Sequence, residues 1–208
     1  MDLWKIDREF TEAGFHAVCG VDEAGRGPLA GPVFAAAVIL PADKEIPGLN
    51  DSKKLSAAKR EELFRVIVEE ARAFGISYAD HNEIDSINIL KATFLAMKRA
   101  VGKLSVKPDI VLVDGNRDPG FEYPSICIVG GDGKSASIAA ASVLAKVSRD
   151  RYMSEIAKEY PRYAFEKHKG YGTRLHYERL RLYGPSDIHR TTFLKGEGGG
   201  KWTRDNAV

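Results

Sequence analysis

The chain has 208 residues, of which 44% are hydrophobic and 29% charged, with a formal net charge of +2 at pH 7. These proportions are typical of a soluble globular protein with one domain, or with one domain and an appendage. No run of eighteen apolar residues and no signal-peptide core near the start are present, so we expect no membrane span. The two cysteines, which lie in apolar runs without metal-ligand spacing, lead us to expect a cytoplasmic protein.

The first hundred residues predict a short polar helix, two neighbouring strands, and two helices separated by a third strand. The turn between the first two strands is too short for a parallel crossover, so these strands should form an antiparallel hairpin. Ser56 is suited to cap a helix, and Gly75 to break the chain after it. The expected elements are a helix at 2–12, strands at 16–21 and 32–40, a helix at 56–73, a strand at 76–79, and a helix from 85 or 86 to 101.

The second half predicts strands at 110–113 and 126–129 and a helix, in one or two pieces, from 134 to about 160, where Pro161 ends it. A last helix is expected at 173–183, and an unstructured tail from Glu197. Strands that pair early and then alternate with helices predict an α/β fold with a mixed five-stranded sheet flanked by helices.

Four acidic residues stand at or just beyond predicted strand ends, where sites of open α/β sheets assemble. Asp22 and Glu23 close the first strand, Asp114 closes the fourth, and Asp132 follows the fifth. An all-oxygen set without histidine or cysteine suits Mg²⁺ or Mn²⁺, and such sites commonly hold two ions that clamp a phosphodiester. For each acid alone, a solvated turn residue is the competing interpretation, and for Asp132 a helix cap.

Two glycine motifs resemble nucleotide-binding loops only in part. The motif that begins at Gly25 is followed by a β-run rather than a helix, which disfavours a dinucleotide site. The Gly-Lys-Ser at 133–135 lacks the earlier glycine of a phosphate-binding loop, since position 128 is isoleucine, which disfavours an ATPase. Residues 133–190 contain twelve Lys/Arg against six Asp/Glu, so this region either faces a polyanion or has solvated helix faces.

Five motifs in order resemble type 2 ribonucleases H, specifically the bacterial ribonuclease HII family. They are Val-Asp-Glu-Ala-Gly-Arg-Gly-Pro-Leu-Ala-Gly-Pro-Val at 21–33, Asp-Ser-Lys-Lys-Leu at 51–55, Val-Asp-Gly-Asn at 113–116, Ala-Ala-Ala-Ser-Val-Leu-Ala-Lys-Val at 139–147 with Arg149 and Asp150, and His-Lys-Gly-Tyr-Gly-Thr at 168–173. The resemblance implies an RNase H-like catalytic domain at 1–160, a helical substrate-binding segment at 161–195, and a tail at 196–208.

The resemblance also implies a metal-dependent endonuclease, acting as a monomer, that cuts RNA in RNA–DNA hybrids. It implies cleavage on the 5′ side of a single ribonucleotide in duplex DNA, the entry step of ribonucleotide excision repair, leaving 3′-hydroxyl and 5′-phosphate ends. Metal-ligand roles are expected for Asp22, Glu23, Asp114 and Asp132, whereas Asp150 is expected to be structural.

Recognition of the 2′-OH is expected from the backbone of Gly25, Arg26 and Gly27, and the matching tyrosine of the family implies that Tyr171 stacks on the neighbouring sugar. His168 either orients the Tyr171 loop or packs in the core. The other candidates for substrate contact, with solvated surface as the alternative for each lysine, are Lys53, Lys54, Lys134, Ser135, Ser137, Lys146 and Lys169. A non-catalytic module that binds RNA–DNA hybrids or junctions remains the alternative function, although it would not need four strand-end acids.

Overall fold

The computed structural model describes residues 2–194, and the predicted tail at 196–208 lies outside them. Its centre is a five-stranded sheet in the order β3-β2-β1-β4-β5. The hairpin of β1 and β2 and the β2–β3 pair are antiparallel, whereas β4 runs parallel to both β1 and β5. The predicted mixed sheet is thereby confirmed. The strands are β1 (Val18–Ala24), β2 (Val33–Ile39), β3 (Ala73–Ala79), β4 (Ile110–Asp114) and β5 (Ser125–Ile128).

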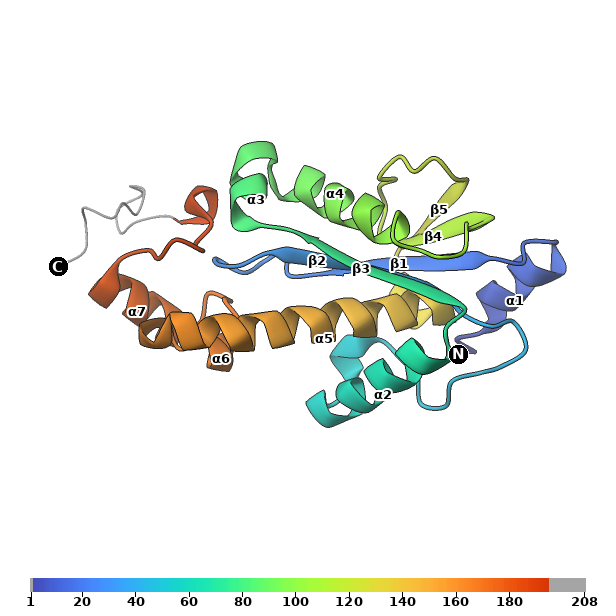
Figure 1. The fold of residues 1–208 in the computed structure, drawn as a ribbon, viewed down its shortest axis with the longest axis horizontal. Helices are drawn as coiled ribbons and strands as arrows, with labels where there is room; N and C mark the ends of the chain where they lie inside the picture. Colours follow the sequence, from blue (N-terminus) through green and yellow to red (C-terminus); the bar gives the residue numbers. More distant parts are fainter. Residues whose placement is uncertain (1, 195–208) are drawn as a thin grey trace.

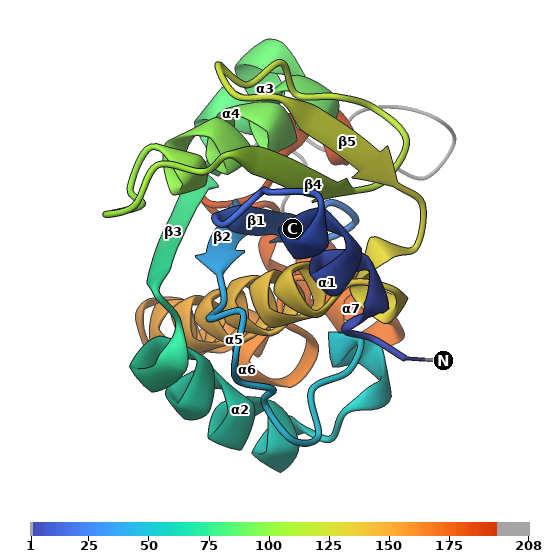
Figure 2. The ribbon, with the colours of Figure 1, turned by 90° about the vertical axis from the view of Figure 1, so that its right-hand side faces the viewer.

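Helices cover both faces of the sheet, as Figures 1 and 2 show. One face is covered by α3 (His81–Ile87) and α4 (Ile89–Val101), and the other by the long α5 (Ala136–Glu159), which has α2 (Ala57–Glu70) packed outside it. No helix among residues 2–194 is both long and apolar enough to cross a membrane. The remaining elements are α1 (Lys5–Glu12), α6 (Phe165–His168), α7 (Arg174–Tyr183), and the 3₁₀ turns η1 (Ser52–Lys54), η2 (Gly131–Gly133), η3 (Pro161–Tyr163) and η4 (Thr191–Phe193).

Glycine lets α5 lie directly on the central strand. A Cβ at Gly20 of β1 would stand 2.0 Å from the carbonyl carbon of Ser137 and 2.2 Å from the nitrogen of Ile138. Every residue of β2 is buried, because α4 and α5 cover the two faces of the sheet beside it. This close packing aligns α5 with β1, so that Ser142, further along the helix, lies beside Asp22.

The predicted boundary between the second helix and the third strand was wrong. The helix ends at Glu70 rather than near residue 73, and Gly75 lies inside β3 instead of breaking the chain. A Cβ at Gly75 would stand 2.1 Å from the carbonyl oxygen of Ala100 in α4. The glycine therefore permits close helix–strand packing, a tertiary requirement that local propensity does not reveal.

The single helix predicted from residue 85 or 86 to 101 is two helices. Asp80 and Glu83 form a reciprocal capping box that begins α3 earlier than expected. Asn88 then breaks the helix with a φ of +69°, and its side chain accepts hydrogen bonds from the amides of Leu90 and Lys91 to begin α4. Conversely, α5 is one uninterrupted helix capped by Ser135, so Asp132 is not its cap.

Candidate active site

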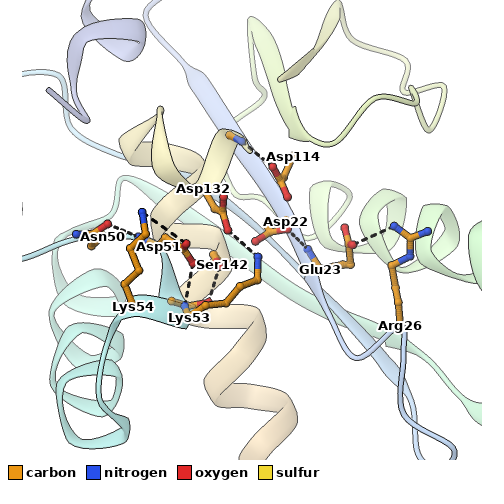
Figure 3. Close-up of polar contacts among 12 residues, drawn as sticks. Asp22, Glu23, Arg26, Asn50, Asp51, Lys53, Lys54, Asp114, Asp132 and Ser142 are labelled. Atoms are coloured by element: carbon orange, nitrogen blue, oxygen red, sulfur yellow. Dashed lines mark hydrogen bonds and ion pairs between the residues drawn. The ribbon is translucent and has the colours of Figure 1, made fainter. Parts of the chain in front are cut away.

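The predicted acidic residues converge at one edge of the sheet. In the parallel pairing of β1 with β4, Val21 lies opposite Val113, so the next residues, Asp22 and Asp114, are also neighbours. Asp132 reaches the same edge from η2, which follows β5. Figure 3 shows Asp22 and Asp132 pointing toward each other, with Asp114 close by.

Three of the four acids form a tight cluster. One carboxylate oxygen each from Asp22, Asp114 and Asp132 lies within 4.8 Å of the others, and Asp22 and Asp132 are only 4% and 6% exposed. Glu23 is not part of this cluster, because successive side chains of a strand point to opposite faces. Asp22 therefore faces α5, whereas Glu23 faces α4 and lies 3.4 Å from the guanidinium of Arg26.

The cluster carries more negative charge than its surroundings compensate. Burial, followed by the charges of Glu23 and Asp114, raises the pKa of Asp22 well above its ordinary value. Burial and the neighbouring Asp132 raise the pKa of Asp114, and burial raises that of Glu23 although Arg26 opposes the shift. Closely spaced oxygen donors that resist ionisation without a cation suit a divalent metal ion.

Lys53 supplies the nearest positive charge. Its Nζ lies 2.9 Å from Asp132, and this hydrogen bond raises the pKa of the lysine. Asp51 caps η1 by accepting from the amide of Lys53, and the hydroxyl of Ser52 lies 2.7 Å from that of Ser142 in α5. The loop that carries Lys53 is thus fixed to the helix beside the acids, although the lysine side chain itself is 76% exposed.

Glycine occupies positions 25 and 27 of the turn after β1 for different structural reasons. Gly25 has a φ of +102°, and a Cβ there would stand 2.0 Å from Nε of the buried Arg149. Around Gly27 the space is open, and the nearest atom to an added Cβ is Cε1 of Tyr171 at 3.9 Å. Packing against Arg149 thus explains the glycine at position 25, whereas the turn is open at Gly27. The approach of a ligand to either glycine stays a prediction.

Tyr171 stands on the same surface as Gly27 and is 41% exposed. Lys146 and Arg149 lie on its ring, with Nζ at 5.9 Å and Cζ at 5.6 Å from the ring centroid. A partly exposed ring held by two cations suits a stacking platform for a sugar or base.

A model of the family described as Ribonuclease HII matches residues 19–195. The chain belongs to the ribonuclease HII family. Ribonuclease HII of Endomicrobium trichonymphae is 58% identical over 193 residues, which cover 92% of each chain. Ribonuclease HII of Caldicellulosiruptor bescii is 55% identical over 194 residues, covering 93% of this chain and 94% of the relative.

Solved structures agree with this assignment. Ribonuclease H2 from Pyrococcus horikoshii OT3 superposes with a TM-score of 0.70 at 29% identity, covering 84% of this chain and 92% of that one. A Bst-RNase HIII in complex with Mn²⁺ has the same fold, with a TM-score of 0.63 at 18% identity and coverage of 84% of this chain and 65% of that one. The RNase H-like fold is confirmed, and the ribonuclease HII family makes this chain a ribonuclease H endonuclease.

Two residues of this ribonuclease HII chain that were predicted to contact substrate, Ser135 and Ser137, are buried instead of lying on the surface of the site. Ser135 and Ser137 are 0% and 1% exposed, and their hydroxyls lie 3.1 Å apart. The free amides at the start of α5 are also taken, because the carboxylate of Asp7 accepts from those of Ala136 and Ser137 at 2.9 and 3.0 Å. These serines build the helix start rather than a phosphate-binding surface.

The other predicted residues surround the site at its surface or beneath it. His168 is buried, and its Nδ1 accepts from the amide of Gly170, directly before Tyr171. Asp150, expected to be structural, is 2.7 Å from Lys146. Among the remaining lysines, Lys54 lies 3.9 Å from Asp51, Lys134 donates to the carbonyl of Val129 at 2.6 Å, and Lys169 donates to the hydroxyl of Ser154 at 2.6 Å.

A cavity of about 360 Å³ adjoins the acids on the α4 side of the sheet. Glu23 and Asp114 form its wall toward the cluster, and Arg26 and Arg117 contribute positive charge. Arg117 was not among the predicted residues, although it directly follows the Val-Asp-Gly-Asn motif. Apolar residues of α4 form another part of the wall: Leu90, Phe94 and Met97.

Proposed function

We propose that this chain is a divalent-metal-dependent endonuclease that cuts the RNA strand of RNA–DNA hybrids. We further propose that it cuts on the 5′ side of single ribonucleotides in duplex DNA, leaving 3′-hydroxyl and 5′-phosphate ends. The observation that carries the proposal is the cluster of Asp22, Asp114 and Asp132, whose oxygens lie within 4.8 Å of one another in a chain of the ribonuclease HII family.

The donor set fits Mg²⁺ or Mn²⁺, because it consists of carboxylate oxygens alone and its charge is uncompensated. Asp22, Asp114 and Asp132 would hold one ion, and Glu23 would complete the set for a second. When bound, such a pair of ions stabilises the attacking and leaving oxygens of a phosphodiester. An ion held by Asp132 would compete with the ammonium group of Lys53, which lies 2.9 Å from Asp132, and Lys53 would then contact a phosphate.

The chain itself would position the substrate. The open face of the turn at Gly27 lets its backbone reach the 2′-OH, the one local difference between RNA and DNA. Tyr171 would stack on the adjacent sugar, and the surrounding lysines would hold phosphates. We assign this role to residues 161–195 together with the catalytic residues of 1–160. Monomeric action in the cytoplasm stays a prediction of the sequence.

The burial of the acids argues against the alternative, a non-catalytic module that binds hybrids or junctions. A binding module gains nothing from carboxylates that repel both each other and phosphate, and that destabilise the metal-free fold. The two functions differ in their dependence on metal. A binding module would bind the hybrid equally well with Mg²⁺ and in EDTA, whereas an endonuclease would lose cleavage in EDTA.

The deciding experiment uses a DNA duplex with a single embedded ribonucleotide, labelled at each 5′ end in turn. With Mg²⁺ or Mn²⁺ we expect one cut on the 5′ side of the ribonucleotide, no cut in EDTA, and no cut in the matched all-DNA duplex. Mapping the ends to the nucleotide tests the position of cleavage. Binding of the duplex without cleavage in either metal would contradict the proposal.

A further inference from the structure

A fully buried guanidinium holds the turn that contains Gly25, Arg26 and Gly27. Arg190 is 0% exposed and lies just before η4 near the end of the described chain. Three of its nitrogens donate to four carbonyl oxygens of the turn and the residues after it: those of Gly25 (2.6 Å), Arg26 (2.9 Å), Pro28 (2.8 Å) and Gly31 (2.8 Å).

The segment that carries Arg190 is fixed from its other side by α3. Asp85 accepts hydrogen bonds from the amide and hydroxyl of Thr191 at 2.7 and 2.8 Å and from the amide of Thr192 at 3.0 Å. The amide of Arg190 also donates to the carbonyl of Leu29 at 2.8 Å. One carboxylate thus fixes the two residues that follow Arg190, and Arg190 in turn fixes the turn.

Two buried guanidinium groups lie beside this turn. Among residues 2–194, no carboxylate forms an ion pair with Arg190 or with Arg149, the second buried arginine beside the turn. A buried guanidinium without an ion-pair partner is costly, and here its hydrogen bonds to four carbonyl oxygens offset that cost. What a guanidinium offers in addition is several donors in a rigid plane, which hold several carbonyls in one arrangement.

We propose that Arg190 is the positioning residue of the sugar-reading turn, and that Asp85 sets its place by clamping Thr191 and Thr192. The inference rests on the proposed function, in which the backbone at Gly27 reads the 2′-OH. Because Arg190 is fully buried, it acts on substrate only through the turn. A hydrogen bond to a hydroxyl tolerates only a few tenths of an ångström, and a 1 Å misplacement costs on the order of 10²-fold in rate.

The test compares Arg190→Lys and Asp85→Asn with the wild-type enzyme. Lysine keeps the charge but loses the planar donors, and asparagine keeps the shape of Asp85 but places an amide against the amides of Thr191 and Thr192. The control is Arg72→Met, which removes an arginine that donates to the carbonyl of His16 near the opposite end of β1. Each folded variant is tested on duplexes with one embedded ribonucleotide and without it.

Two quantities distinguish positioning from a merely structural role. The first is the Kd of the all-DNA duplex divided by the Kd of the ribonucleotide duplex, both measured in EDTA. The second is the change in kcat relative to the change in KM, measured with Mg²⁺ on the ribonucleotide duplex. We expect Arg190→Lys and Asp85→Asn to lower the Kd ratio about tenfold and kcat on the order of 10²-fold. KM on the ribonucleotide duplex should rise with its Kd, whereas affinity for the all-DNA duplex should stay within about twofold, because phosphate contacts are untouched. All of these quantities should stay within about twofold in the control.

An unchanged Kd ratio and an unchanged kcat in both folded variants would overturn this inference and leave the proposed function intact. A proportional loss of all-DNA binding and kcat, with the Kd ratio kept, would show that Arg190 is merely structural and would also overturn it. If Arg190→Lys does not fold, Asp85→Asn decides by the same two quantities. If the wild type itself does not cleave the ribonucleotide duplex, the proposed function fails first, and this inference fails with it.

Discussion

At Asp114 the requirements of chemistry and stability oppose each other. Its raised pKa means that the folded state disfavours the ionised carboxylate, so ionisation destabilises the metal-free protein above the folded pKa. Asp114→Asn keeps the hydrogen bond that Asp114 accepts from the amide of Gly131 and removes the charge. We expect cleavage to fall by on the order of 10²-fold or more, hybrid binding to persist, and the melting temperature in EDTA to rise. Normal turnover in Mg²⁺ would contradict the carboxylate site.

Gly25 and Gly27 should respond differently to the same change. Gly25→Ala forces a Cβ against the buried Arg149 at a positive φ, so we expect destabilisation of about 1–3 kcal/mol. Gly27→Ala meets only Tyr171 at van der Waals distance, so the fold should keep its stability while cleavage at an embedded ribonucleotide falls. Thermal melts and initial rates on the same samples check both. Equal melting temperatures for the two variants would contradict the distinction.

Tyr171 has two separable parts, the ring face and the hydroxyl. Tyr171→Phe keeps the platform supported by Lys146 and Arg149, whereas Tyr171→Ala removes it, with a loss of about 1–3 kcal/mol by analogy with base–aromatic stacking. We expect cleavage rates in the order wild type, Phe, Ala, with unchanged melting temperatures since the ring is 41% exposed. A large drop in the melting temperature of the alanine variant would assign Tyr171 to packing instead.

At the scale of elements, the contact of β1 with α5 decides where the site forms. Gly20→Ala would place its Cβ against backbone atoms of Ser137 and Ile138, which cannot rotate away, so we expect a loss of about 3 kcal/mol. The matched control is Gly102→Ala at the end of α4, where the backbone is right-handed (φ −64°) and the nearest neighbour is 3.3 Å away. Denaturant unfolding should give a far smaller change there, and equal losses would contradict the argument.

At the scale of the molecule, three buried histidines connect successive parts of the C-terminal segment: His168 of α6, His176 of α7, and His189, which follows α7. His168 and His176 stack with ring centroids 4.4 Å apart, and Nε2 of His176 lies 2.9 Å from that of His189. Burial, with neighbouring histidines as the second cause, lowers the pKa of His176 to about 4 and of His189 to about 3. The unfolded chain therefore binds protons first as pH falls below about 6.5.

The sign of this linkage predicts acid sensitivity. The stability contributed by the neutral histidines is fully present above pH ~6.5 and is lost as pH falls toward 4 and 3, by on the order of 3 kcal/mol per histidine. In melts from pH 7 to 4, His189→Asn should flatten this decline, because asparagine does not titrate. The exposed control His16→Asn should decline as the wild type does. Equal declines in His189→Asn and wild type would contradict the prediction.

Much of the fold followed from local pattern. The apolar runs predicted five strands near their observed places, and the short turn after β1 correctly predicted the antiparallel hairpin. The errors at Gly75 and Asn88 share one cause. Gly75 stays in β3 because α4 packs against it, and Asn88 divides two helices by a positive φ that other residue types rarely adopt. The error at Gly75 arose because its packing partner is distant in sequence. The error at Asn88 arose because a single residue adopts an unusual backbone conformation.

The sequence by itself determined the family, the acidic residues and their strand-end positions, because motif order and strand periodicity are local properties. Only the tertiary structure decided which acids meet. The pleat of β1 sends Asp22 toward α5 and Glu23 toward α4, so three carboxylates gather and the fourth lines the adjoining cavity together with Asp114. The tertiary structure also buries Ser135 and Ser137 and places Arg190 beneath a turn some 160 residues earlier in the chain. Such contacts depend on how the elements pack in three dimensions, which no local pattern encodes.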